Sequence, residues 1–145
     1  MANVLGVEGR AVSLPGSLYL FFFPIPVVCF VGALVTDVVY GTSAFLMWLH
    51  FSQWLIAVGI AFRIVAGIVL LVELFSRPGT SGLHAAFFYV GLVVEIVNAF
   101  VHTADGWTAV VPMGLALSAV GAVLMLAAVG TLFRLRARLV EFRRL

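Results

Sequence analysis

Four ionisable residues interrupt long apolar stretches of this 145-residue chain: Asp37, Arg63, Glu73 and Glu95. An ionisable side chain in the middle of a membrane helix costs about 2.5 to 3.5 kcal/mol, so such residues are candidates for function. Gly79, in a predicted loop, lies sixteen residues from both Arg63 and Glu95. An antiparallel helical hairpin would therefore bring these two to the same depth. We predict an intramembrane ion pair between Arg63 and Glu95, whose simplest role is a structural clamp.

A polar stripe accompanies Glu95. Asn98 and His102 follow it at i+3 and i+7, which places all three on one face of a helix. This stripe is the best indication in the sequence of a proton path or a buried site. Three residues are few for a complete path, because a transport route normally lines more of a helix face with polar groups.

Further polar residues gather toward one predicted end of the helices, and we call them the predicted outer cluster: Asp37, His50, Gln53 and Asp105, next to His102. Histidines on two helices suggest haem b ligation by His50 and His102. However, His50 lies 29 residues from Gly79 and His102 only 23, an offset of about 9 Å along the helices. Interfacial histidines that contact water or headgroups, His84 included, are the simpler interpretation. A bound haem b or quinone therefore stays an alternative to no cofactor.

Other reaction chemistry has no recognisable basis in the sequence. No Ser/His/Asp set, phosphate-binding loop or HExxH motif is present. No three or four potential ligands have the spacing of a metal site, and the one cysteine, Cys29, lies in an apolar stretch. The chain is more simply explained as a protein without catalytic activity.

The composition indicates what positions these residues. Hydrophobic residues make up 64% of the chain, charged residues 10%, and the mean hydropathy is +1.24. Soluble domains carry about 25% charged residues, so a water-soluble globule is excluded. We predict an all-α fold, an integral membrane four-helix bundle that forms a single domain over residues 1–145. Its spans cover about residues 18–40, 45–75, 83–103 and 107–133, followed by a basic amphipathic tail at 134–145.

The arginines predict the orientation. Arg10 precedes the first span, Arg77 lies in the second loop, and five arginines follow the last span: Arg134, Arg136, Arg138, Arg143 and Arg144. The positive-inside rule then places both termini in the cytoplasm, as expected of a multi-pass protein of the bacterial inner membrane. The five tail arginines are predicted to contact anionic lipid or an acidic partner. Nucleic acid is not an expected partner, because the basic run is short and lies against the bilayer.

Small residues form two faces that favour close helix packing. One combines Gly59 and Gly67 with Arg63, and the other combines Gly114, Ser118, Gly121 and Ala122. Packing inside the bundle is the commonest use of such faces. Contact with a second copy of the chain is the alternative.

Two segments carry a family resemblance: PIPVVCFVGALVTDVVY from Pro24 to Tyr40, and NAFVHTADGWTAVVPMGLALS from Asn98 to Ser118. They resemble the bacterial four-helix membrane proteins catalogued as domain of unknown function 2231. Members are often encoded beside, or fused to, quinoprotein sugar dehydrogenases of the sorbosone type or c-type cytochromes. The resemblance therefore implies an accessory or electron-transfer role at the membrane.

This sequence departs from the family pattern in three informative places. Tyr19 and Leu20 stand where a His-Pro pair is expected, Arg63 replaces a small residue, and Ala104 replaces a basic one. If the family binds a cofactor through the histidine of its first span, this chain lacks that ligand. The leading hypothesis is a non-catalytic membrane subunit that anchors or organises a partner, such as other subunits of a redox complex. A haem b or quinone electron carrier and a small transporter or proton channel are the alternatives.

Overall fold

The computed structural model describes residues 4–5, 11–12, 16–76, 81–104 and 110–142. Two short strands, β1 (Val4–Leu5) and β2 (Ala11–Val12), pair antiparallel, and the other elements are helical. The helices are α1 (Ser17–Phe22), α2 (Pro24–Ser43), α3 (Leu46–Ser76), α4 (Gly82–Thr103), η1 (Val110–Gly114) and α5 (Leu115–Phe142). Four stretches are long and apolar enough to cross a membrane: Ser17–Ser43, Leu46–Ser76, Gly82–Thr103 and Val110–Ala137. The predicted all-α fold with four spans is confirmed.

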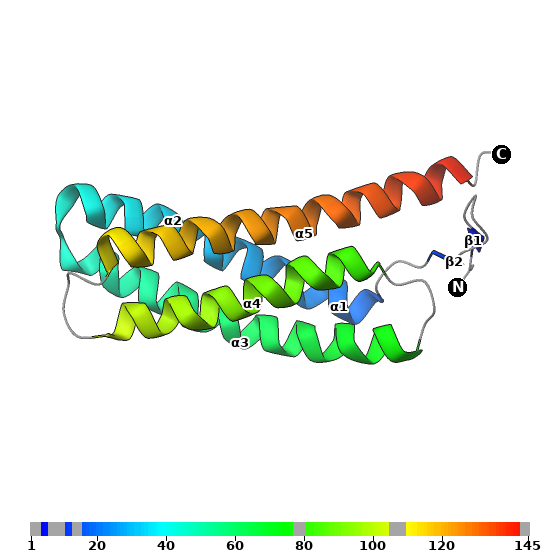
Figure 1. The fold of residues 1–145 in the computed structure, drawn as a ribbon, viewed down its shortest axis with the longest axis horizontal. Helices are drawn as coiled ribbons and strands as arrows, with labels where there is room; N and C mark the ends of the chain where they lie inside the picture. The colour runs from blue at the N-terminus through cyan, green and yellow to red at the C-terminus, as the bar shows by residue number, and fades with distance from the viewer. Residues whose placement is uncertain (1–3, 6–10, 13–15, 77–80, 105–109, 143–145) are drawn as a thin grey trace.

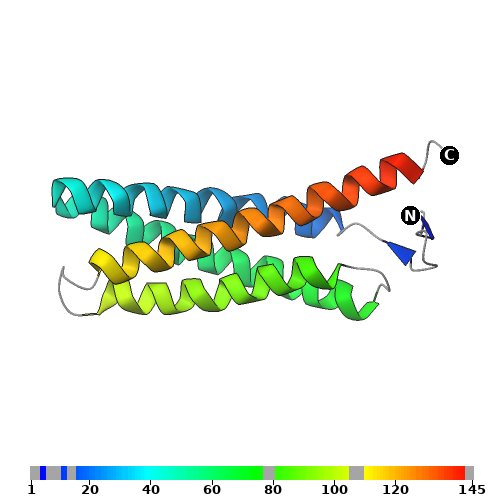
Figure 2. The same ribbon diagram turned by 45° about the horizontal axis from the view of Figure 1, so that its top comes forward.

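The long helices form a four-helix bundle (Figures 1 and 2). α2 and α4 each pack against both α3 and α5, so the four long helices surround one common interior. α1 begins and α5 ends at the same end of the bundle, which we call the α3–α4 end (Figure 1). The opposite end, where α2 turns into α3 and α4 finishes, is called the α2–α3 end.

Local sequence signals explain several helix boundaries. Pro24 occupies the first turn of α2, where its missing N–H is not needed. The chain turns from α2 into α3 at Ala44, which adopts the left-handed conformation (φ 53°, ψ 21°) and donates its N–H to Tyr40 O. The Ser81 hydroxyl accepts from the N–H of His84 at 3.3 Å and caps α4. Val111 leaves helical geometry just before Pro112 and so bends the entry to α5.

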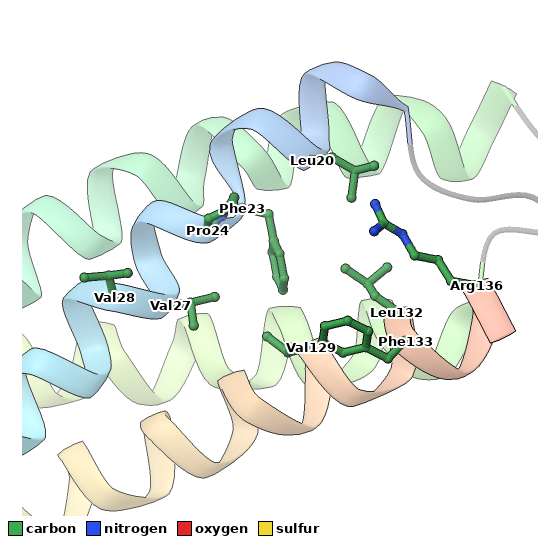
Figure 3. A pocket seen from close by; sticks show the side chains of 9 residues that line it. All are labelled: Leu20, Phe23, Pro24, Val27, Val28, Val129, Leu132, Phe133 and Arg136. Carbon is green, nitrogen blue, oxygen red and sulfur yellow. The ribbon is translucent and has the colours of Figure 1, made fainter.

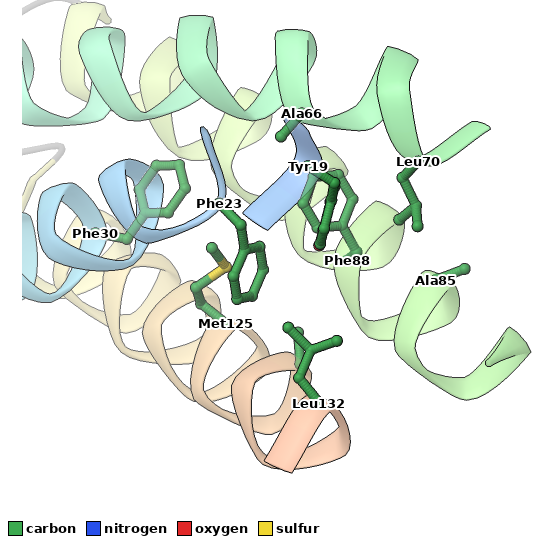
Figure 4. Close-up of a cluster of buried hydrophobic side chains, with 10 residues drawn as sticks. Tyr19, Phe23, Phe30, Ala66, Leu70, Ala85, Phe88, Met125 and Leu132 are labelled. Carbon is green, nitrogen blue, oxygen red and sulfur yellow. The ribbon is translucent and has the colours of Figure 1, made fainter. Parts of the chain in front are cut away.

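The bundle is apolar on its outside and holds polar groups inside. Trp54 and Phe75 are 72% and 86% exposed, whereas Asp37 and Arg63 are fully buried. An outward apolar surface is favourable in lipid, where no water competes for the polar groups within. Near the α3–α4 end the interior is mainly apolar and aromatic, and Figure 4 shows residues of this core, among them Phe88.

The predicted basic tail begins as a continuation of the fourth span. α5 continues without interruption to Phe142, so Arg134, Arg136 and Arg138 belong to the same helix as the fourth span. Arg134 and Arg136 are exposed. Arg143 and Arg144 lie outside the described residues. The helix continues because 115–142 contains neither proline nor a left-handed glycine that would end it.

Candidate functional site

A buried carboxylate and a buried histidine meet near the α2–α3 end. His102 Nε2, from α4, lies 3.1 Å from Oδ1 of Asp37, from α2. Asp37 is fully buried and His102 is 3% exposed. Ser52 of α3 places its Oγ 3.3 Å from the same nitrogen, and the Gln53 amide donates to the carbonyl oxygen of His102 at 2.6 Å. Side chains of two other helices, α2 and α3, thus hold one histidine of α4.

The contacts continue inward through α5 and back to α4. The Ser118 hydroxyl donates to Asp37 Oδ2 at 2.5 Å and accepts from the Asn98 amide at 2.9 Å. The same amide nitrogen donates to Glu95 Oε2 at 3.2 Å. All of these side chains are buried. We call the set the Asp37–His102 network; its members are Asp37, Ser52, Glu95, Asn98, His102 and Ser118.

Hydrogen-bond directions require a proton between Asp37 and His102. His102 Nδ1 lies 3.0 Å from the backbone carbonyl oxygen of Asn98 and must donate to it. In a neutral imidazole, Nε2 is then an acceptor, and it faces a carboxylate oxygen, which is also an acceptor. The 3.1 Å contact is favourable only if one proton lies between these two atoms. The pair is therefore either an imidazolium with a carboxylate, or an imidazole with a carboxylic acid.

The predicted direct ion pair between Arg63 and Glu95 is not formed, so that prediction is wrong. Arg63 Nη2 instead donates to Phe88 O at 2.5 Å, and the guanidinium lies over the rings of Phe30 and Phe88, 5.4 and 4.9 Å from their centroids. The guanidinium occupies the space beside Gly91, which is one helical turn before Glu95. Glu95 turns toward α5 instead. Equal depth of Arg63 and Glu95 in the α3–α4 hairpin is therefore not enough to bring their side chains into contact.

Glycines create the room for both charged side chains. A Cβ on Gly91 would collide with the Arg63 guanidinium, and one on Gly121 would collide with the Glu95 carboxylate. A Cβ on Gly114 would likewise lie only 2.9 Å from Cε1 of His102. The small-residue face of the fourth span therefore packs within the bundle around the network. It is not free to form the alternative contact with a second copy.

Four buried polar atoms have no hydrogen-bond partner among the residues that the structure describes. Two are donors, Nε and Nη1 of Arg63, and two are acceptors, Oε1 of Glu95 and Oδ1 of Asn98. They belong to side chains from neighbouring turns of α3 and α4. Buried polar atoms are normally paired, so an unpaired set with both donors and acceptors indicates where polar molecules such as water would be stabilised.

A second polar group lies near the α3–α4 end, and we call it the His84 cluster: Tyr19, His84 and Thr131. His84 is fully buried, so its expected contact with water or headgroups is wrong. Its Nδ1 lies 2.9 Å from Thr131 Oγ1 and 3.0 Å from Ala128 O, and its Nε2 lies 2.7 Å from the Tyr19 hydroxyl. Because Thr131 already donates to Ala128 O, Nδ1 must be the donor and Nε2 the acceptor from Tyr19.

The structure does not bring together the two histidines considered for haem ligation. His50 is exposed, whereas His102 is buried with both ring nitrogens engaged. Of the predicted outer cluster, Asp37 and Gln53 contact His102, and Asp105 lies outside the described residues. Among the residues described, no three His, Cys, Asp or Glu side chains converge as a metal site.

Sequence reasoning missed some network members and the buried role of His84. Ser118 was identified only as a small packing residue, and Ser52 carried no signal of its own. Spacing did place Glu95, Asn98 and His102 on one face of α4, and the structure buries all three. The partners across the interface come from other helices, and a single helix period cannot reveal them.

Comparisons with known proteins identify the family. The family model described as "Predicted membrane protein (DUF2231)" matches residues 21–134, which cover well over half of the chain. No curated protein and no solved structure matches the chain. The matched region runs from α1 into α5 and contains the whole Asp37–His102 network. The chain therefore belongs to the DUF2231 family of predicted membrane proteins, as its two characteristic segments suggested.

Proposed function

We propose that this protein is a non-catalytic membrane subunit that binds a proton between Asp37 and His102 and exchanges it with one side of the membrane. The observation that carries the proposal is the contact of His102 Nε2 with Asp37 Oδ1, which requires a shared proton. Buried ionisable residues in membrane spans are costly, and proton relays are one of the functions that use them.

The proton would exchange through the α2–α3 end. His102 lies one residue before the end of α4, and Gln53, which is only partly buried, holds its carbonyl. Within the pair, transfer moves the proton from the Asp37 carboxyl oxygen to His102 Nε2 or back, with no change in total charge. Ser118 steadies the second oxygen of Asp37 by donating to it.

Arg63 and its aromatic neighbours would prevent the proton from moving on to the α3–α4 end. The Arg63 guanidinium is always charged and lies against Phe30 and Phe88, at the start of the apolar core. A fixed cation repels protons in a narrow pore. Asn98 also interrupts a relay between Asp37 and Glu95, because its amide donates to both sides but does not give up its protons. The site is thus a proton-binding site open to one side, which distinguishes it from a channel.

Infrared spectroscopy tests the proton site. Difference spectra of the protein in liposomes, recorded between high and low pH, should show the carbonyl stretch of a protonated carboxylic acid. We expect Asp37→Asn to remove this band, His102→Gln to change the pH at which it appears, and the matched control Tyr19→Phe to leave it unchanged. A band that survives Asp37→Asn but vanishes in Glu95→Gln would overturn the assignment to the Asp37–His102 pair.

Proton flux into the same liposomes tests the closed end. With a potassium gradient and valinomycin, the wild-type protein should conduct no faster than empty vesicles. Flux that is present in the wild type and lost in Glu95→Gln combined with His102→Ala would overturn the closed site and establish a channel.

Anchoring a partner is the second candidate, and the exposed arginines at the end of α5 favour it. Arg134 and Arg136 extend the fourth span at the α3–α4 end, where an acidic partner could bind. Capture of the intact protein in mild detergent, with an absorption spectrum of the eluate, tests this role. A co-eluting subunit lost in the double variant Arg134→Gln and Arg136→Gln would support it. Elution of the protein alone would oppose it, and a Soret band would indicate haem.

A further inference from the structure

A cavity lies away from the Asp37–His102 network, on the surface between the first span and the end of α5. Its volume is about 320 Å³, within the range of small-molecule sites. Figure 3 shows it between the α1–α2 segment on one side and α5 on the other. Because this surface is part of the apolar exterior, a molecule would reach the cavity from the lipid.

The walls of the cavity are apolar because both of the segments that form it present mainly apolar side chains there. The Phe23 ring, 5% exposed, forms the inner wall and packs on Tyr19 and Phe88, with ring centroids 5.2 and 6.2 Å apart. Next to it, α2 contributes only the short side chains of Pro24, Val27 and Val28. On α5 the lining consists of Val129, Leu132 and Phe133. Short residues beside a large ring leave a groove that an alkyl chain can fill.

One lining residue is charged. Arg136 is exposed, and Figure 3 shows its side chain reaching from α5 back toward Leu20 at one end of the groove. An arginine guanidinium offers several N–H donors in one plane and binds phosphate well. It lies at the end of the fourth span, where the arginines predict the anionic cytoplasmic leaflet.

The groove therefore combines apolar walls with a cationic side chain at its end. A neutral quinone would gain little from the cation, and a second copy of the chain would need an acidic group at a matching position. We propose that the groove binds one anionic phospholipid. An acyl chain lies against Phe23, Pro24 and Leu132, and the lipid phosphate binds Arg136. This site is independent of the proposed proton site.

Native mass spectrometry of the whole protein tests the proposal. The protein is extracted from vesicles of equal parts phosphatidylglycerol and phosphatidylcholine, and the retained lipids are counted. We expect one retained phosphatidylglycerol per chain, in at least about fivefold preference over phosphatidylcholine. Arg136→Gln should abolish the preference. Arg134→Gln is the matched control, because Arg134 lies two residues earlier on the same helix and outside the groove, and this variant should keep the preference.

A second variant separates the groove from general surface charge. Leu20→Trp places a large ring in the groove and leaves every arginine in place, so it should reduce retained phosphatidylglycerol as strongly as Arg136→Gln. An equal loss in Arg134→Gln and Arg136→Gln would overturn the specific site in favour of diffuse attraction. Equal retention of both lipids, or a lipid-free dimer, would overturn the anionic phospholipid as the occupant.

Discussion

The two buried histidines of this bundle have opposite surroundings. His84, near the α3–α4 end, contacts a tyrosine hydroxyl, a threonine hydroxyl and a backbone carbonyl, all of them uncharged. His102, near the α2–α3 end, contacts a backbone carbonyl, a serine hydroxyl and the carboxyl group of Asp37. Both side chains are buried and both join three helices.

The difference shows that the partners of a buried histidine decide its chemistry. Every hydrogen bond of His84 is satisfied by one neutral tautomer, so the His84 cluster needs no charge. The Asp37–His102 network needs one additional proton, and two of its members, Glu95 and Asn98, have unpaired atoms, as does the neighbouring Arg63. Burial favours fully paired neutral groups, so the first cluster suits stability and the second suits proton binding.

Removing the carboxylate should have the largest effect on stability. Asp37→Leu removes the carboxylate that contacts both His102 and Ser118, so the buried Ser118 hydroxyl loses its acceptor and His102 loses its charged partner. We expect the free energy of unfolding to fall by about 3 kcal/mol. Tyr19→Phe removes one neutral hydrogen bond of the His84 cluster and should cost about 1 kcal/mol. Denaturation in mixed micelles, followed by circular dichroism, measures both, and equal losses would contradict the distinction between the two regions.

A methyl group beside Glu95 should have the next largest effect. In Gly121→Ala the new Cβ collides with the Glu95 carboxylate, which must move and give up its bond from Asn98. We expect a loss of about 1 to 3 kcal/mol and a lower melting temperature. Gly130→Ala is the matched control on α5, because no atom outside the adjoining helix backbone lies within 4 Å of its Cβ position. A similar melting temperature for the two variants would show that Glu95 is not confined.

Removing one hydroxyl group from each region should give a smaller difference in the free energy of unfolding. Ser118→Ala removes the group that links Asn98 to Asp37, and we expect a cost of about 1 to 2 kcal/mol. Thr131→Val should cost only about 0.5 kcal/mol, since His84 Nδ1 keeps its bond to Ala128 O. The same denaturation assay compares them. A larger loss in Thr131→Val would reverse the assignment of the more sensitive region.

Nitrogen-15 magnetic resonance compares the protonation of the ring nitrogens of the two histidines directly, independently of any stability measurement. At neutral pH we expect the His84 signal of a neutral ring protonated at Nδ1 only. His102 should instead show Nδ1 protonated and Nε2 either protonated or sharing its proton with Asp37. Asp37→Asn should move the Nε2 signal of His102 and leave that of His84 unchanged. A neutral His102 with an unprotonated Nε2 in the wild type would contradict the shared proton.

Part of the candidate site could be predicted from the sequence because it lies on a single helix. The spacing of Glu95, Asn98 and His102 fixes their common face whatever surrounds it. Contacts between helices could not be predicted in this way. Equal depth predicts the Arg63–Glu95 pair, but the side chains turn to different neighbours, Arg63 toward Gly91 and Glu95 toward Gly121.

The sequence by itself determined that the chain forms four apolar helices in a membrane, because too few charged residues are present to cover a soluble domain. It also identified the family from two segments that the family match contains. Only the tertiary structure decided that His84 is buried beside Tyr19 and that His102 meets Asp37. The physical reason is that hydropathy decides which helices can lie in lipid. Which side chains touch across two helices depends on how each helix is rotated about its axis and on where glycines leave room for a neighbouring side chain.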